Sequence, residues 1–325
     1  MVAFTIAVTD HPFRSAEPER ALARELGAEL RLGQCKSVEE VKELVRGADA
    51  VLTSLAPVSA EVIASLDHCR IIARYGIGVD NVDLAAATRQ KIAVTNVPDY
   101  ATDEVSDHAL ALLLACARKI VVADRSVHAG SWELATVAPM YRLRGQSLGL
   151  IGLGKIARRL AVKAQALGLH VYGTDPYVTD EMLASLDITR VGVEELLHRS
   201  DFVSLHAPLT DETLHLMNAD TLAMMKPGAF LINTARGALI DEDALAEALA
   251  SGKIAGAALD VTVSEPLALT SPLRALPSGR LILTPHIAYY SEESLRDLQQ
   301  QAVDEVKRAL RSEPVRALVN RELLV

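Results

Sequence analysis

Short apolar runs alternate with amphipathic segments over the first hundred residues of the chain. The apolar runs have the length of buried strands and lie at residues 4–8, 29–32, 50–53, 71–74 and 92–95. Helical periodicity marks the segments between them, at residues 19–26, 38–46, 60–66 and 84–89. Ser37 followed by Glu40 matches a capping box at the start of the second helix. Strands and helices that alternate through short links predict a parallel sheet covered on both faces.

A longer helix is predicted at residues 103–119. Its interior, residues 108–117, is apolar on nearly every side, so we expect it to be buried all round, between domains or between subunits. His108 within it is interpreted as a core or interface histidine in preference to a ligand. Residues 123–144 carry Trp132 but show no clear period. We expect them to form an arm that packs on a neighbouring chain in a homodimer.

The alternation of strands and helices resumes after residue 145 and continues to about residue 285. One strand begins at Leu148, and further strands are predicted at residues 170–174, 202–205, 230–233, 257–260 and 281–283. Helices are predicted at residues 155–167, 193–198, 219–225 and 242–251, and a long amphipathic helix at 291–311 is expected to run back to the first domain. The pattern predicts an α/β fold of two doubly wound parallel-sheet domains. Residues 1–100 and 291–325 would form one domain and residues 101–290 the other.

Composition and charge narrow the class of protein. A length of 325 residues exceeds one typical core, and the net charge of −9 argues against a general binder of nucleic acid or membrane surfaces. The longest apolar run, residues 109–117, is far short of the ~20 residues that span a bilayer, and the first strand lacks the basic lead of a signal peptide. Cys35, Cys69 and Cys116 show no metal-ligand spacing, which favours buried free thiols over a catalytic or metal-binding cysteine. We therefore expect a soluble, cytoplasmic protein with no metal site.

A glycine turn separates the strand that begins at Leu148 from the helix that follows it. Gly152 would make the tight turn, Gly154 would let the backbone approach a pyrophosphate, and the helix N-terminus would turn its amides toward the phosphates. Asp175 follows Gly152 by 23 residues, close to the ~20 expected for the acid that binds a ribose 2′-hydroxyl. An aspartate there repels a 2′-phosphate, so NAD is favoured over NADP. The alternative is an ordinary glycine turn in a parallel sheet.

Three side chains suited to acid–base chemistry each follow a predicted strand of the second domain. They are Arg236, Glu265 and His286, and the carboxyl ends of parallel strands meet at one edge of a sheet. An arginine can bind a carboxylate and polarise a carbonyl, and a histidine can move a proton at neutral pH while a glutamate fixes its tautomer. This set predicts hydride and proton transfer at a hydroxy or keto acid. Taken singly, each also has a plain structural explanation, as a surface arginine, a loop acid or a capping histidine.

Two further loops lie at strand ends. Arg74 precedes Gly76 and Gly78, so accessible amides and a bidentate guanidinium could together bind a carboxylate. A tight loop with a surface arginine is the alternative. His206, Ala207 and Pro208 follow the strand at 202–205 and are expected to line the nicotinamide ribose or the pyrophosphate.

The motifs at residues 152–157, 206–210, 233–237, 260–266 and 284–286 resemble, in order, those of the D-isomer-specific 2-hydroxyacid dehydrogenases. The resemblance covers essentially the whole chain and implies a Rossmann NAD domain inserted into a flavodoxin-like substrate domain, in a homodimer held by the cofactor domains. It also implies Arg236, Glu265 and His286 as the catalytic set. The cofactor contacts that we assign are Gly152, Leu153, Gly154, Lys155, Ile156, Asp175, His206, Ala207, Pro208, Thr234, Ala235, Asp260 and Ala288.

Residues 74–81 and 286–292 are similar to the branch of this family that contains the C-terminal binding protein corepressors. That branch implies a substrate pocket formed by Arg74, Tyr75, Gly76 and Tyr289, although it carries tryptophan where this chain has Tyr289. The expected reaction is the NAD-dependent interconversion of a D-2-hydroxy acid and its 2-oxo acid. Two alternatives stay open: an NADH-sensing module that recruits partners, and a dehydrogenase for 3-phosphoglycerate.

Overall fold

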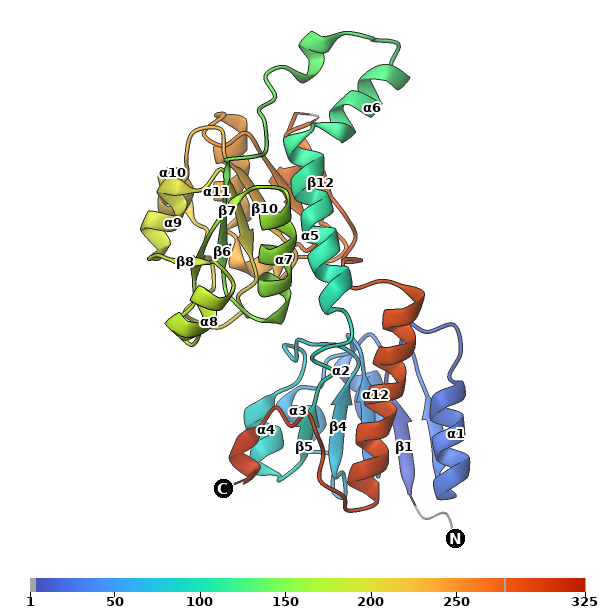
Figure 1. Cartoon of the computed structure of the whole chain (residues 1–325). Helices are drawn as coiled ribbons and strands as arrows, with labels where there is room; N and C mark the ends of the chain where they lie inside the picture. The colour runs from blue at the N-terminus through green and yellow to red at the C-terminus, as the bar shows by residue number, and fades with distance from the viewer. Residues whose placement is uncertain (1–3, 278, 325) are drawn as a thin grey trace. The chain divides into compact units, whose positions relative to one another are not determined.

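The chain forms two compact units, each with its own sheet. The computed structural model describes residues 4–277 and 279–324. One unit consists of Met1–Ala101 and Ser291–Val325, which we call unit 1, and the other of Thr102–Tyr290, which we call unit 2. Figure 1 shows both units and labels many of their strands and helices.

Unit 1 is built on a parallel sheet in the order β2-β1-β3-β4-β5. This is the flavodoxin-like strand order that was predicted. Its strands are β1 (Thr5–Val8), β2 (Glu29–Leu32), β3 (Ala50–Thr53), β4 (Ile71–Arg74) and β5 (Ala93–Thr95).

Helices cover both faces of the unit 1 sheet. Because side chains alternate along a strand, Ile6 and Val8 enter one core while Ala7 enters the other. The first core lies under α1 (Glu17–Leu26) and α12 (Glu292–Leu310). The second lies under α2 (Val38–Leu44), α3 (Ala60–Ile63) and α4 (Leu84–Arg89).

The last helix packs within unit 1. Gln299 of α12 donates to Ser15 O at 2.8 Å and to Glu19 Oε2 at 2.9 Å on the first helix. Beyond α12, Leu318 forms an antiparallel bridge with Thr95 of β5. The two ends of the chain therefore complete the same core.

Unit 2 carries a second parallel sheet, in the order β12-β11-β10-β9-β6-β7-β8. The strands are β6 (Ser147–Ile151), β7 (His170–Thr174), β8 (Thr189–Arg190), β9 (Phe202–Leu205), β10 (Phe230–Asn233), β11 (Gly256–Leu259) and β12 (Leu281–Leu283). The direction of strand order reverses between β6 and β9, which is the point where doubly wound sheets bind dinucleotides. The predicted Rossmann topology is confirmed.

The two faces of this second sheet also bury alternate residues. Ile232 packs in the core under α5 (Thr102–Ala117) and α7 (Lys155–Ala166), whereas Leu231 packs in the opposite core. That opposite face is covered by α9 (Val193–Arg199), α10 (Ala219–Met224) and α11 (Glu242–Ala250). Nearly continuous apolar strands are the expected result of burial on both faces.

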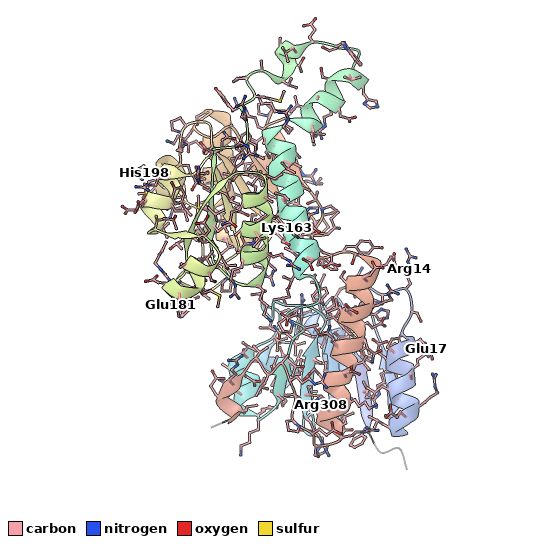
Figure 2. All side chains as sticks on the ribbon, in the orientation of Figure 1. Arg14, Glu17, Lys163, Glu181, His198 and Arg308 are labelled. Carbon is pink, nitrogen blue, oxygen red and sulfur yellow. The ribbon has the colours of Figure 1, made fainter. Side chains whose placement is uncertain are left out.

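Helix α5 is covered on one side within the single chain. Leu112 and Leu113 are buried, whereas Asp107 and Ala111 are exposed, so burial of its outer side between subunits stays a prediction. Lys163 of α7, labelled in Figure 2, places its Nζ 2.6 Å from Asp107 Oδ1 and 2.7 Å from Ser106 Oγ. Helix α5 is buried on the side that packs against α7, β10 and β11.

Some elements were not predicted from the pattern. The stretch expected to be aperiodic contains α6 (Ile120–His128) and a 3₁₀ turn at Leu134–Val137, and α8 (Asp180–Ser185) precedes the edge strand β8. None of the side chains of α6 is fully buried in this chain. A helix that does not pack against a core has no need of a continuous apolar face, so its sequence lacks a clear helical period. Within the described ranges, no helix combines the length and hydropathy needed to cross a membrane.

Candidate active site

The glycine turn after β6 has the shape that a dinucleotide site requires. Gly152 adopts φ +85°, and a Cβ atom there would lie 2.5 Å from Ala207 N, so only glycine allows the two loops to approach. Gly154 caps α7 without a side-chain hydrogen bond, and a Cβ built on it would meet no atom within 4 Å. The turn at Gly154 therefore leaves room for a ligand beside the start of α7.

Asp175 lies beside this turn, immediately after β7. Its Oδ2 accepts from Leu153 N at 2.8 Å and its Oδ1 accepts from Tyr177 N at 2.8 Å. The side chain of Leu153 is fully buried, so Leu153 shapes the turn through its amide bond to Asp175. Both carboxylate oxygens of Asp175 are thus held by backbone amides.

One buried hydroxyl beyond the end of β10 has no partner among the described residues. Thr234 follows β10, and its Oγ1 forms no hydrogen bond with any described residue. A buried polar atom without a partner is costly, so such an atom marks a place where a ligand can supply one. The glycine turn, the oriented Asp175 and this hydroxyl fit a bound dinucleotide.

His206 follows β9 and lies against the same turn through its backbone. Its Nε2 is 2.9 Å from Ser204 Oγ, and burial lowers the pKa of His206 to about 4. The imidazole is therefore neutral at physiological pH. Ala207 is buried while Pro208 is exposed, so the loop presents a largely apolar wall.

The loop after β10 is shaped by Asn233 and carries Arg236. Asn233 is fully buried; its Nδ2 donates to Arg236 O at 2.7 Å, and its Oδ1 accepts from Ala235 N at 2.9 Å. A Cβ atom on Gly237 would lie 2.0 Å from the carbonyl carbon of Thr262, so the loop after β10 contacts the loop after β11 directly. This close approach brings the Arg236 loop beside the loop that carries Glu265.

Asp260, at the end of β11, organises the loop after β12. Its Oδ1 accepts from Ile287 N at 3.0 Å and its Oδ2 accepts from Ala288 N at 2.8 Å, while its main-chain O accepts from His286 N at 2.8 Å. Asp260 and Ala288 are both buried. Asp260 is therefore committed to holding the backbone of residues 286–288.

His286 and Glu265 form a hydrogen-bonded pair. His286 Nδ1 lies 2.7 Å from Glu265 Oε2, and Thr262 N donates to Glu265 Oε1 at 3.1 Å. Burial raises the pKa of Glu265, but the hydrogen bond and charge of His286, the Thr262 amide and the charge of Arg236 hold that pKa below its ordinary value. Glu265 is thus ionised at neutral pH, and the Nε2 atom of His286 is left for a ligand.

Tyr289 lies next to this pair. Its ring is 6.2 Å from the His286 ring, centroid to centroid, in an edge-to-face arrangement at 81°. An aromatic side chain in that position restricts the orientation of the imidazole. The loop after β12 therefore supplies both the imidazole and an aromatic wall beside it.

The loop after β4 in unit 1 differs in part from its prediction. Gly76 adopts φ +144°, and a Cβ atom on it would collide with the Arg74 guanidinium, so glycine is needed where the arginine folds back. The Tyr75 side chain is 2% exposed, packs edge-to-face on Phe13 and donates to Glu19 Oε1 at 2.6 Å. Only the backbone of Tyr75 can therefore contact a substrate, because its side chain lies in the core.

One histidine near the site had been interpreted as a core or interface residue. His108 Nε2 lies 3.0 Å from Thr284 Oγ1 and 3.5 Å from Asp260 Oδ1. The sequence signal that could have revealed it is a lone histidine in an otherwise apolar helix. Its partners could not be predicted, because they lie on two strand ends far away in the sequence.

A hollow of about 650 Å³ lies at the opposite edge of the unit 2 sheet. Its lining includes Phe202, Phe230, Gly256 and Leu281, the first residues of four parallel strands. The loops that carry His286, Glu265 and Arg236 follow the carboxyl ends of strands instead. This hollow is therefore separate from the site.

Comparison with known proteins identifies the family. Residues 110–288 match the model for the NAD binding domain of D-isomer specific 2-hydroxyacid dehydrogenases. A glyoxylate reductase from Korarchaeum cryptofilum is 38% identical over 315 residues, which cover 94% of both chains. A D-3-phosphoglycerate dehydrogenase from Archaeoglobus fulgidus is 38% identical over 298 residues, which are 91% of this chain but only 56% of that protein.

A solved structure shows the same fold over the whole chain. The crystal structure of a glyoxylate reductase from Paecilomyes thermophila superposes with a TM-score of 0.90 at 28% sequence identity, covering 99% of this chain and 100% of that one. The predicted fold class and NAD as cofactor are confirmed by these likenesses. The chain belongs to the D-isomer specific 2-hydroxyacid dehydrogenases, a family of NAD-dependent oxidoreductases, and carries their NAD-binding domain at residues 110–288.

Proposed function

We propose that this chain reduces a 2-oxo acid to a D-2-hydroxy acid, reversibly, with Arg236, Glu265 and His286 as the catalytic residues. NADH, when bound, supplies the hydride that the C2 atom of the oxo acid gains. The proton that completes the reduction passes from His286 Nε2 to the carbonyl oxygen, and the reverse reaction returns it. The observation that carries the proposal is the 2.7 Å contact between His286 Nδ1 and Glu265 Oε2.

Glu265 and Arg236 have separate roles in this proposal. Glu265, ionised in its loop, accepts from Nδ1, fixes the tautomer of His286 and stabilises its charged form. Arg236 binds the substrate carboxylate and polarises the carbonyl that receives the hydride. The loop contact at Gly237 supports this arrangement, because it positions the arginine loop against the glutamate loop.

The residues that would hold the cofactor are those of the glycine turn and the loops beside it. Gly152, Gly154, Lys155 and Ile156 would bind the pyrophosphate, and Asp175 the ribose hydroxyls. The loop of His206, Ala207 and Pro208 and the residues Thr234, Ala235, Asp260 and Ala288 would surround the nicotinamide end. The partnerless Thr234 hydroxyl supports this assignment.

We further propose that unit 1 is the substrate domain, and that Arg74 with the backbone of Tyr75 and Gly76 binds the substrate carboxylate. The guanidinium folded back over Gly76 supports this role, because the missing Cβ at Gly76 leaves room for it there. Tyr289 would form the wall of the pocket. We also propose that the chain is related to the branch of the C-terminal binding proteins. The similarity of residues 74–81 and 286–292 supports this, with Tyr289 in place of that branch's tryptophan.

The substrate can be identified by following NADH oxidation with a panel of 2-oxo acids. The panel contains glyoxylate, pyruvate, hydroxypyruvate, longer aliphatic and aryl oxo acids, and phosphohydroxypyruvate. The last tests the phosphoglycerate alternative, which relatives such as the Archaeoglobus protein suggest. Tight NADH binding without turnover on any of these acids would favour the NADH-sensing alternative instead.

His286→Ala tests the assignment of the general acid. We expect turnover on the best substrate to fall by ~10²–10⁴-fold while NADH binding persists. Arg236→Ala should abolish turnover because it removes the carboxylate clamp. Wild-type turnover by purified His286→Ala would show that the proton comes from another group.

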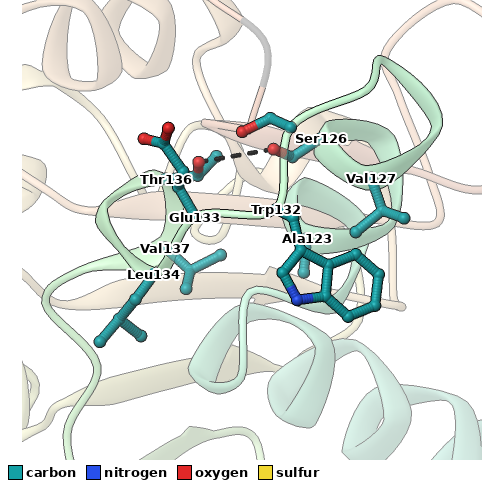
Figure 3. Close-up of a pocket in the computed structure, with 9 residues that line it drawn as sticks. Ala123, Ser126, Val127, Trp132, Glu133, Leu134, Thr136 and Val137 are labelled. Carbon is teal, nitrogen blue, oxygen red and sulfur yellow. Dashed lines mark hydrogen bonds between the residues drawn. The ribbon is translucent and has the colours of Figure 1, made fainter.

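We also propose that the protein is a homodimer through residues 123–144, which we call the arm. Trp132, Leu134 and Tyr141 are 87%, 78% and 69% exposed in this chain, and exposed apolar groups of this kind mark interfaces. Figure 3 shows Trp132 and Leu134 at a hollow of about 200 Å³ between α6 and the 3₁₀ turn. Light scattering of Trp132→Glu and Leu134→Glu should show monomers where the native chain forms dimers.

The proposed compartment is the cytoplasm. Cys69 and Cys116 are buried free thiols, and burial raises the pKa of each to about 12. Buried thiols with a raised pKa are unreactive, and free thiols are typical of proteins in a reducing compartment. Localisation of the tagged full-length protein would test this.

A further inference from the structure

We propose that His108 is a positioning residue for the loop of His286, acting through Thr284 and Asp260. This inference rests on the proposed function, because it assigns His108 to the proton-transfer site of that function. His108 lies on α5, and the four residues come from a helix and two strand ends. Their polar atoms form a continuous chain of hydrogen bonds.

The first link joins the helix to the strand ends. His108 Nε2 is 3.0 Å from Thr284 Oγ1 and 3.5 Å from Asp260 Oδ1. The His108 side chain is 22% exposed and the Asp260 side chain only 1%. The partly exposed imidazole of His108 therefore lies beside the buried carboxylate of Asp260.

Hydrogen counting sets the direction of this link. The Thr284 hydroxyl has one hydrogen and donates it to Asp260 Oδ1 at 2.5 Å. Its oxygen can therefore only accept from His108, so the Nε2 atom of His108 must carry a proton. A side chain at position 108 that cannot donate would leave the Thr284 oxygen without its partner.

The second link ends on the backbone of the catalytic loop. Asp260 accepts from Ile287 N and Ala288 N through its two carboxylate oxygens. His286 itself adopts φ +54°, a conformation that a residue with a side chain holds only when its surroundings impose it. Asp260 imposes it here, and His108 with Thr284 fixes the orientation of Asp260.

Packing alone would select a different residue at this position. The neighbouring residues Ala109, Leu112 and Leu113 are buried and apolar, and leucine forms helices better than histidine. If His108 only filled space, leucine and glutamine at position 108 would serve equally well. The proposed role requires an N–H donor, which glutamine keeps and leucine lacks.

The test compares His108→Leu with His108→Gln in the full-length protein. We expect kcat on the best 2-oxo acid to fall by ~10–100-fold in the leucine variant, the scale of a small misplacement of a catalytic group, and glutamine to recover most of it. The KM for the oxo acid should stay within a few fold in both. His198→Leu is the matched control, since His198 is an exposed histidine on α9.

Hydrogen exchange of the amides of residues 286–288 gives a readout that does not depend on turnover. We expect these amides to exchange faster in the leucine variant than in the glutamine variant and the native chain. Equal kcat and equal exchange in the two variants would overturn the proposal. If the native chain turns over none of the acids, the proposed function fails, while the exchange rates still decide whether His108 holds the loop.

Discussion

The Nδ1 atom of His286 lies 2.7 Å from the Oε2 atom of Glu265, although the two residues are 21 positions apart in the sequence. Each lies in a loop after a strand of the same parallel sheet, and the loops meet because β11 and β12 are neighbours in that sheet. The pairing leaves one imidazole nitrogen for the substrate. Because the contact uses one oxygen of Glu265, a glutamine at this position would remove the negative charge and keep an oxygen acceptor.

Glu265→Gln should separate charge from geometry. Glutamine keeps an oxygen acceptor for Nδ1 but loses the negative charge that stabilises the imidazolium. We expect kcat/KM for oxo-acid reduction to fall on the order of 10²–10⁴-fold and the basic limb of its pH profile to move to lower pH. Superimposable pH profiles for the variant and the native enzyme would contradict this role.

Asp175→Asn should relax the preference for NADH over NADPH. The native carboxylate repels a 2′-phosphate by about 1–4 kcal/mol at contact distance, so we expect the ratio of kcat/KM for NADPH to that for NADH to rise by roughly tenfold or more. Steady-state kinetics with both cofactors measures it. Asp220→Asn, an exposed aspartate at the start of α10, is the control and should leave the ratio unchanged.

Gly237→Ala and Gly154→Ala should fail in different ways. The new Cβ at 237 would lie 2.0 Å from Thr262 C, so we expect a loss of roughly 1–3 kcal/mol in the free energy of unfolding. The Cβ at 154 meets no atom of the chain within 4 Å, so that variant should unfold like the native protein but bind NADH more weakly. Urea unfolding and NADH fluorescence distinguish the two, and equal stability of both variants would show that the loops can move apart freely.

His206 should make stability depend on pH between about 6.5 and 4. Burial lowers its folded-state pKa to about 4, so the unfolded chain binds the proton first as the pH falls. The stabilisation is complete above the ordinary histidine pKa of about 6.5 and is lost as the pH falls toward the folded value. Because part of residue His206 remains exposed, we expect the native chain to lose about 1–3 kcal/mol relative to His206→Gln over this range.

Urea midpoints at several pH values between 7 and 4 measure the difference. Glutamine is chosen because its amide can keep the contact with Ser204 Oγ. Parallel loss of stability in both proteins would mean that His206 does not titrate in this range. Carboxylates titrate in both proteins and change the stability of both equally, so their contribution cancels in the difference.

Local chemistry accounts for what could be predicted from the sequence. The apolar run of Phe202–Leu205 required a buried strand, and Gly152 with Asp175 marked a turn and an acid at a spacing that one strand, one helix and a second strand impose. The placement of Arg236, Glu265 and His286 after strands followed from the same periodicity. These features depend on backbone geometry within a few residues, which a linear pattern encodes.

Partner choice was decided by the tertiary structure. His108 contacts Thr284, 176 positions away, and Tyr75 turns from its loop into the core to reach Glu19, 56 positions away. No clear period was found in α6, and none of its side chains is fully buried by the described residues. The sequence by itself determined which residues form strands, turns and helix caps, since those depend on local conformation and burial. Only the folded sheet decided which polar side chains meet, because that depends on which strand ends lie next to each other.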